Sequence, residues 1–211
     1  MKITILYDNT VTVPALTPDW GFSCLIETGT RNILFDTGGN GRILLENMAI
    51  LGIDPASIDD IFISHQHFDH IGGLSAMLNE NQNAVVHIPP SVRGIKYKNQ
   101  VISYSTPSEI YPGIYTTGEL NDIEQSMFLD TQKGAVVIIG CCHPGLGNIL
   151  GTFPDKKISL IVGGLHGSEE YEVMERSEKI CPSHCTRHIE DIKSRFYDKY
   201  IPGGAGTVIE L

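Results

Sequence analysis

Hydrophobic and polar positions along the chain alternate between short apolar runs and glycine-rich turns. The apolar runs have the length of strands, and they predict strands at residues 3–7, 22–27, 32–35, 61–64, 84–88, 114–117, 126–130, 135–140, 158–162 and 207–211. Apolar positions spaced near 3.6 residues predict helices at 41–52, 73–79, 169–180 and 186–197. Because strands and helices are interspersed through the whole length, the pattern indicates a layered α/β fold. No linker divides the 211 residues, so we predict one domain, 1–211.

Turn and cap residues support several of these boundaries. The segment "TGTR" between two predicted strands favours a hairpin, since glycine accepts the positive φ that tight turns need. Gly52 is a typical helix stop at the end of "GRILLENMAILG". Asp54 and Pro55 then form an N-cap and a first helical position, which predicts a short helical turn before the next strand.

Four predicted strands run directly into a histidine or aspartate and then into glycines. The segments are "ILFDTGG", "DDIFISHQHFDHIGGL", "GAVVIIGCCHPGLGNIL" and "ISLIVGGLHG". Ligands of sheet proteins gather where strands end and loops converge. The repeated pattern therefore predicts one shared polar site.

The densest of these junctions, "HQHFDH", has the composition of a metal site. His65 and His67 are two residues apart in an extended loop and can face one ion, while Asp69 and His70 follow a turn and can face a second. A structural cluster would have to satisfy four polar side chains at once, which favours metal binding. Zinc is the expected ion, with two ions possible and manganese, iron or magnesium still open.

The same motifs carry a family resemblance over nearly the whole chain. "HQHFDH" followed by "IGGL" resembles the signature of the metallo-β-lactamase superfamily, and "LFDTGG", "GCCHPG" and "HCT" resemble its other motifs. The combination of "CCHPG", "GGLH" and "PSHCT" is similar to a branch that includes archaeal methanopterin dihydropteroate synthase-like proteins and many hydrolases. The resemblance implies a four-layer αβ/βα sandwich with a metal site along one edge.

Carried onto this sequence, the resemblance implies two sets of metal ligands. The first ion would be held by His65, His67 and His143, and the second by Asp69, His70 and His184. Asp36 would orient a ligand from behind. Metal-activated water would be the nucleophile, and Asp69 and His166 are the candidate catalytic residues.

One feature departs from the superfamily pattern. Superfamily members usually place a bridging aspartate at the end of the strand after the third motif, but "LIVGGLHG" contains no acid. His166 is the nearest replacement. Two interpretations of His166 stay open, a metal ligand and a hydrogen-bonded residue or proton donor near the pocket.

The remaining histidines and cysteines have simpler interpretations. His87 is typical of a half-buried strand residue, and His188, predicted one helical turn beyond His184, of a solvated or capping residue. Cys141 and Cys142 favour core packing over metal binding. Cys181 and Cys185 flank His184, and a zinc knuckle is a minor alternative. "EEYEVMERSEK" is predicted to be an exposed helix face.

Charge and composition narrow the partners. A net charge of −10 argues against a general nucleic-acid surface, and "RGIKYK" is the only basic stretch, predicted to be a solvated loop. No apolar run approaches the roughly 20 residues of a membrane span. "MKITILYDNT" is predicted to be a first strand rather than a signal peptide, and the odd number of five cysteines suits a reducing compartment, so we expect a cytoplasmic protein.

The sequence thus favours a hydrolase of small-molecule esters, thioesters, lactones or phosphodiesters, with homo-oligomers possible. A transferase acting on a pterin diphosphate is the alternative enzyme, and it would need a cationic pocket for the leaving diphosphate. A non-enzymatic metal-binding sensor or redox carrier is the third reading, to be separated by metal analysis.

Overall fold

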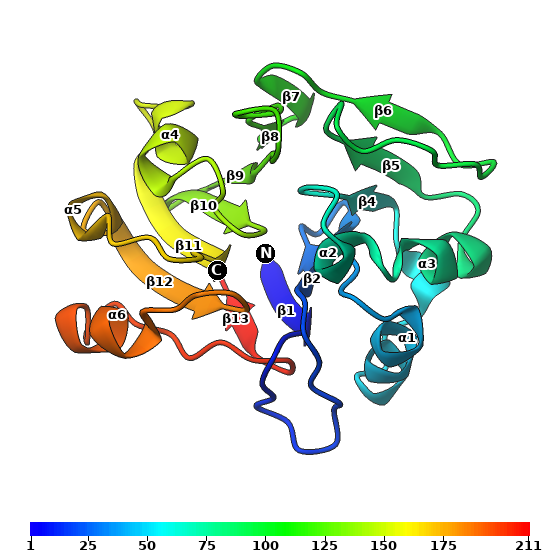
Figure 1. Cartoon of the computed structure of the whole chain (residues 1–211), viewed down its shortest axis with the longest axis horizontal. Coiled ribbons are helices and arrows are strands. Elements are labelled where there is room, and N and C mark those ends of the chain that lie inside the picture. The colour runs from blue at the N-terminus through cyan, green and yellow to red at the C-terminus, as the bar shows by residue number, and fades with distance from the viewer.

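The computed structural model describes all of residues 1–211 as two β-sheets that face each other (Figure 1). The first sheet has the order β13-β1-β2-β3-β4-β5-β6. Its strands are β1 (Lys2–Tyr7), β2 (Ser23–Glu27), β3 (Asn32–Phe35), β4 (Asp60–Phe62), β5 (Val85–Ile88), β6 (Val101–Ser103) and β13 (Val208–Glu210). The second sheet has the order β12-β11-β10-β9-β8-β7. Its strands are β7 (Ser108–Tyr111), β8 (Ile114–Thr116), β9 (Met127–Thr131), β10 (Gly134–Ile139), β11 (Ile158–Gly164) and β12 (Ser177–Ser183).

Helices cover the outer face of each sheet (Figure 1). Those beside the first sheet are α1 (Gly41–Ile50), α2 (Phe68–Ile71) and α3 (Leu74–Glu80), and those beside the second are α4 (Leu146–Gly151), α5 (Tyr171–Met174) and α6 (Ile189–Arg195). No helix has the length and apolar content needed to cross a membrane.

Three buried hydrophobic clusters correspond to the three interfaces between these layers. The first lies between the sheets and includes Ile5 and Phe62 from one sheet and Val136 from the other. The second packs α1 and α3 against the first sheet, and the third packs α4, α5 and α6 against the second. Since alternate side chains of a strand point to opposite faces, each sheet has a core on both sides. The predicted four-layer αβ/βα sandwich is confirmed.

Local sequence signals explain several element boundaries. The Asn40 side chain accepts hydrogen bonds from the first turn of α1, and Gly52 beyond its end has a φ of 71°. Asp54 accepts from the Ala56 amide and caps the short 3-10 helix η1 (Pro55–Ser57) with Pro55 at its start. The predicted cap and the predicted glycine stop are both confirmed.

The predicted helix at 169–180 is wrong in its second half. Only α5 is helical there, and β12 follows it, paired in parallel with β11 along its whole length. Opposite charges at helical spacing suggested a helix, but burial of Ile180 and Cys181 in the second sheet outweighs that local preference. The prediction that "EEYEVMERSEK" forms an exposed helix face is therefore wrong from Ser177 onward, where the chain is a strand.

The predicted helix at 186–197 is shorter in the structure. α6 begins at Ile189, and His188 lies at its N-cap position. His184 follows β12 instead, so His184 and His188 do not share a helix face. The short elements β6, β7, α2 and α4 were not predicted, because none has more than six residues of periodic pattern.

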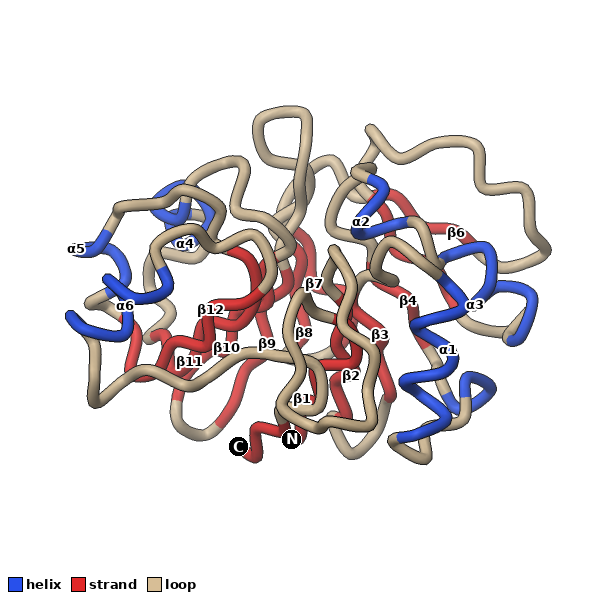
Figure 2. Tube along the Cα trace, turned by 60° about the horizontal axis from the view of Figure 1, so that its bottom comes forward, coloured by secondary structure: helices blue, strands red, loops and turns tan.

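Strand direction determines which loops can meet. β3 and β4 are parallel, and β10, β11 and β12 are parallel, so the loops after each group leave from one edge. The tube in Figure 2 shows α2 and these loops at one edge of the sandwich and both termini at the other. All the junctions singled out in the sequence follow these strands.

Candidate metal centre

Three imidazoles converge at the edge where β4 and β10 end. His65 Nε2 lies 3.1 Å from His67 Nδ1, and His143 Nε2 lies 3.2 Å from the same atom. Two nitrogens bound at 2.0–2.1 Å to one tetrahedral ion would be about 3.3 Å apart. The spacing of the three nitrogens therefore fits a shared divalent cation.

A second group of donors lies beside the first. Asp69 Oδ2 is 3.2 Å from His184 Nε2 and 3.9 Å from His70 Nε2. His184 Nε2 is buried and has no hydrogen-bond partner. An unpaired buried nitrogen is costly, so this atom is well placed for an ion that would complete it.

A buried network behind the cluster orients one histidine of each group. His70 Nδ1 lies 2.7 Å from Asp36 Oδ2, and the Ser64 hydroxyl donates to the same carboxylate oxygen at 2.7 Å. With its proton so used, the Ser64 oxygen accepts from His65 Nδ1 at 2.8 Å. In this tautomeric arrangement the Nε2 lone pairs of His65 and His70 both face the cluster.

The last histidine is oriented by the loop after β1. Asn9 Oδ1 accepts from His184 Nδ1 at 3.1 Å, and the Asn9 amide donates to the His184 carbonyl at 2.9 Å. Asp8 accepts from the His184 backbone amide. These contacts could not be predicted from the sequence, because Asn9 and His184 are 175 positions apart.

Two further residues that the sequence did not reveal support the site. Buried Glu124 accepts hydrogen bonds from the amides of Cys141, Cys142 and His143, which holds the "GCCH" loop in place. Burial raises the pKa of Glu124 to about 7, and the three amides oppose that change. Trp20, half exposed, donates from Nε1 to Asp69 Oδ2 at 2.8 Å.

Electrostatics favour neutral imidazoles in the cluster. Burial, followed by the neighbouring histidines, lowers the pKa of His65, and it lowers the pKa of His143 to about 4. Burial alone would raise the pKa of Asp69, but the adjacent His184 and His70 outweigh it and lower that pKa. A neutral imidazole and an ionised carboxylate are the forms that bind metal ions.

Backbone conformation is unusual at the same positions. Asp36, Cys142, His166 and His184 all have φ between 47° and 62°, in the left-handed region that few non-glycine residues adopt. Each follows a strand of the two sheets. Such conformations cluster at functional sites, where the surrounding structure holds them in place.

His166 lies outside the groups of converging donors. Its ring centroid is 5.3 Å from that of His143, and it lines a hollow with Gly145 and Glu170. The backbone amide of Arg187 donates to the His166 carbonyl, and burial followed by the Arg187 charge lowers the pKa of His166. This placement favours the reading of His166 as a residue near the pocket over the reading as a ligand.

The cysteines divide between core and site. Cys142 packs in the cluster beneath the second sheet, and Cys181 lies between the sheets. Cys141 Sγ instead lies 3.1 Å from His70 Nε2, with Cys185 Sγ 3.3 Å away. The zinc knuckle of Cys181 and Cys185 therefore does not form.

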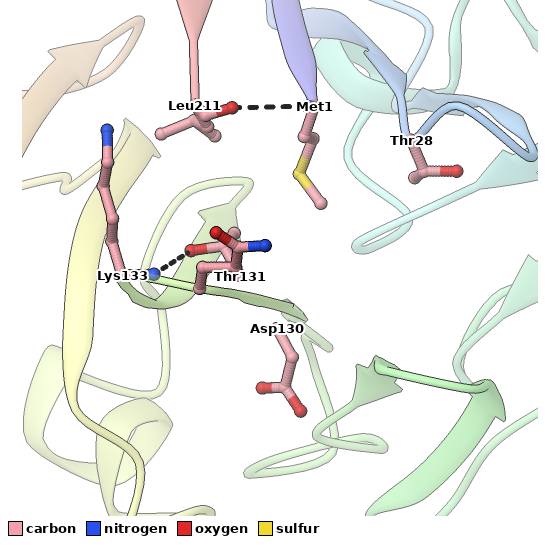
Figure 3. Close-up of a pocket in the computed structure, with 7 residues that line it drawn as sticks. Met1, Thr28, Asp130, Thr131, Lys133 and Leu211 are labelled. Atoms are coloured by element: carbon pink, nitrogen blue, oxygen red, sulfur yellow. Dashed lines mark hydrogen bonds between the residues drawn. The ribbon is translucent and has the colours of Figure 1, made fainter.

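The opposite edge of the sandwich offers no comparable chemistry. The pocket in Figure 3 is lined there by Met1, Thr28, Asp130, Thr131, Gln132, Lys133 and Leu211. It contains no histidine or cysteine, and its side chains come from the end of β9, from turns and from the two termini. The polar edge at the carboxyl ends of the strands is therefore the candidate functional site.

The chain is similar to known proteins in sequence and in fold. The family model described as the metallo-beta-lactamase superfamily matches residues 16–180. A 7,8-dihydropterin-6-methyl-4-(beta-D-ribofuranosyl)-aminobenzene-5'-phosphate synthase of Methanocaldococcus jannaschii is 27% identical, over 80% of this chain and 82% of the relative. The uncharacterized protein MJ0448 of that organism is 28% identical, over 99% of this chain and 100% of the relative. The crystal structure of Tm1679, a metal-dependent hydrolase of the beta-lactamase superfamily, is 26% identical, with a TM-score of 0.81 over 100% of this chain and 99% of that one.

Proposed function

Because the chain belongs to the metallo-beta-lactamase superfamily, we propose that it is a metal-dependent hydrolase of a small-molecule ester, thioester, lactone or phosphodiester. The observation that carries the proposal is the convergence of His65 Nε2, His67 Nδ1 and His143 Nε2 beside a second donor group. In this proposal the first group holds one zinc ion, and Asp69, His70 and His184 hold another. Bound divalent cations would polarise the substrate oxygen and lower the pKa of water.

The protein's own residues have distinct roles in this proposal. Asp36 and Ser64 keep the Nε2 lone pairs of His65 and His70 directed at the ions. Asp69 accepts the proton of the attacking water as well as ligating. His166, at the rim of the adjacent hollow, donates a hydrogen bond from its imidazole to the substrate or leaving group.

The first test is metal stoichiometry. We expect His67→Ala to lose the first zinc ion and the hydrolytic activity, while the fold persists because the His67 side chain is exposed. Metal content by mass spectrometry of the native protein and thermal unfolding would be measured together. His188→Ala is the matched control, since His188 only pairs with Glu169 and Asp191 at the surface. Full zinc content in the His67 variant would defeat the proposal.

A transferase is the second candidate, favoured by the synthase relative and by one cation near the site. The basic stretch Arg93 to Lys98 is a mostly exposed loop, as expected, whereas Arg187 lies next to His166 and could face an anionic leaving group. Turnover of a generic phosphodiester or thioester without a second substrate favours hydrolysis. Turnover only when both substrates are supplied favours transfer.

The remaining alternatives are separable by simple measurements. A sensor or redox carrier would contain iron and show an absorption spectrum, whereas zinc is colourless. The net charge of −10 supports small molecules over nucleic acids as substrates, and a single-stranded RNA incubated with the zinc-loaded protein should stay intact. A coloured protein would favour the iron-containing sensor or redox carrier, and cleavage of the RNA would favour a nucleic-acid substrate.

A further inference from the structure

The second donor group is one ligand short of a complete tetrahedral site. Asp69, His70 and His184 supply three protein atoms. The end of β11, on the same edge, has no side chain to offer, because Gly163 and Gly164 occupy it. A Cβ at Gly164 would lie 2.3 Å from the Gly140 carbonyl and 2.8 Å from Cys185 Sγ. A side chain at Gly164 would therefore clash with Cys185, so β11 cannot supply the missing ligand.

Cys141, just after β10, places a sulfur atom beside the second group. Its Sγ is 3.1 Å from His70 Nε2, and its side chain is buried. The Sγ also groups with ligand atoms of His65 and His70, and separately with those of His184 and Cys185. A thiolate and an imidazole on one tetrahedral zinc would be about 3.5 Å apart, given bond lengths near 2.3 and 2.05 Å. The thiol thus lies between the two donor groups, close to ligand spacing.

The hydrogen-bond directions agree with this placement. His70 Nδ1 is engaged by Asp36, so His70 Nε2 carries the lone pair that faces Cys141. Cys141 Sγ also lies within ligand spacing of a His184 ring nitrogen, and the buried Nε2 of His184 has no hydrogen-bond partner. The Cys141 sulfur and the lone pair of His70 Nε2 thus face each other at a distance that one bound ion could span.

We propose that the Cys141 thiolate is the fourth protein ligand of the second metal ion, between the two ions of the centre. This inference rests on the proposed two-ion hydrolase. Metal binding breaks the Cys141 S–H bond, forms a sulfur–metal bond and releases the proton to solvent. Cys185, whose thiol donates to Cys141 Sγ at 3.3 Å, is a positioning residue that steadies the sulfur.

The metal-free protein keeps Cys141 as a thiol. There the Cys185 thiol donates to Cys141 Sγ, and Cys141 Sγ lies within hydrogen-bond distance of His70 Nε2. A coordinated cation reverses this preference, because a ligating thiol is deprotonated outright. The sulfur ligand also determines the choice of ion, since thiolates select zinc, iron or cobalt over magnesium and manganese.

Cobalt substitution tests the assignment without reference to activity. The wild-type protein loaded with Co²⁺ should bind two ions and show a sulfur-to-cobalt charge-transfer band in the near ultraviolet. Cys141→Ser should lose the band. Its affinity for the second ion should fall by more than the roughly 100-fold typical of losing a residue that only hydrogen-bonds to a ligand. Cys185→Ser should keep the band with a shifted position. Cys142→Ser, a change at the neighbouring core cysteine, should leave spectrum and stoichiometry unchanged.

The outcomes separate this inference from the proposed function. Two bound cobalt ions without a charge-transfer band, or a band that persists in Cys141→Ser, would overturn the thiolate ligand and leave the hydrolase standing. A Cys141–Cys185 disulfide in the metal-loaded protein would overturn it as well. No cobalt bound by the wild type would defeat the metal centre itself. If Cys141→Ser does not fold, Cys141→Asp should keep two ions and lack the band, and a band in that variant would contradict the inference.

Discussion

The first sheet carries two buried histidine–aspartate pairs, one after β3 and one between β4 and β5, and only the first belongs to the candidate metal centre. His70 Nδ1 is 2.7 Å from Asp36 Oδ2, and His87 Nε2 is 2.9 Å from Asp60 Oδ1. Both histidines are almost fully buried. Burial and a carboxylate partner therefore do not distinguish a structural histidine from a ligand.

The second ring nitrogen makes the difference. His87 Nδ1 lies 3.0 Å from the Tyr104 hydroxyl, so both of its nitrogens are paired within the protein. His70 Nε2 instead faces Cys141 and Asp69 among further imidazoles. A histidine paired to a carboxylate and a tyrosine contributes to stability, whereas one held by an acid on one side and surrounded by potential metal ligands on the other is prepared for an ion.

Removing the structural histidine should have the largest effect on stability. His87→Ala leaves the buried Asp60 carboxylate without one of its hydrogen bonds, and we expect a loss of about 2–3 kcal/mol in the free energy of unfolding. Urea unfolding measures this, and zinc content per folded molecule should not change. A variant that lost zinc while keeping its stability would reverse the assignment of the two pairs.

The pH dependence of stability should separate Asp60 from the metal centre. Burial alone would raise the pKa of Asp60, but hydrogen bonds from His87 and Tyr111, with the Arg31 charge, lower it below 3.8. The folded state thus prefers the ionised form, and its stabilisation is present above 3.8 and disappears as the pH falls through the lower folded pKa. The stability gap between wild type and Asp60→Asn should be full at pH 7 and close in acid. A gap that persists at the lowest pH would contradict this account.

Changing the other acid should affect metal affinity more than stability. Asp36→Asn places an amide donor where Ser64 and His70 Nδ1 need an acceptor, so the His70 proton moves toward the ion site. We expect zinc affinity to fall about 10–100-fold, measured by competition with a chelating dye. Asp60→Asn is the matched control, with unchanged affinity per folded molecule.

The smallest effect should come from the edge of the centre. Trp20→Phe removes the indole N–H that donates to Asp69 Oδ2 but keeps an aromatic ring beside His184. Loss of one partly exposed hydrogen bond should weaken the second ion by about threefold to tenfold, as read by the same dye competition. A loss as large as that of Asp36→Asn would mean that Trp20 has a role beyond this bond.

The fold could be predicted from the sequence where the local preference of a segment agrees with its packing in the folded protein. Apolar runs such as 135–140 and 158–162 predicted buried strands, because a strand covered on both faces needs a continuous apolar run. The prediction failed at β12, where Glu178 and Lys179 resemble a helix surface but are the exposed positions of a strand beside β11. Pairing with a neighbouring strand cannot be seen in a local window.

The site divides in the same way. The "HQHFDH" cluster is visible because its donors are adjacent in sequence. Ser64, Asn9 and Glu124 are common polar residues whose roles depend on partners brought close only by folding. For the same reason the sequence favours core packing for Cys141. Its contact with His70 joins two junctions that lie far apart along the chain.

The order of donors along the chain has a consequence for biosynthesis. His65, His67 and His143 precede the last donor, His184, which follows β12 and is hydrogen-bonded to Asn9 from the loop after β1. An ion held by both groups would therefore bind residues that come together only in the folded protein. It would stabilise the native state rather than start folding. Because such an ion binds only the native state, the free energy of unfolding of newly made chains would increase with the concentration of available metal.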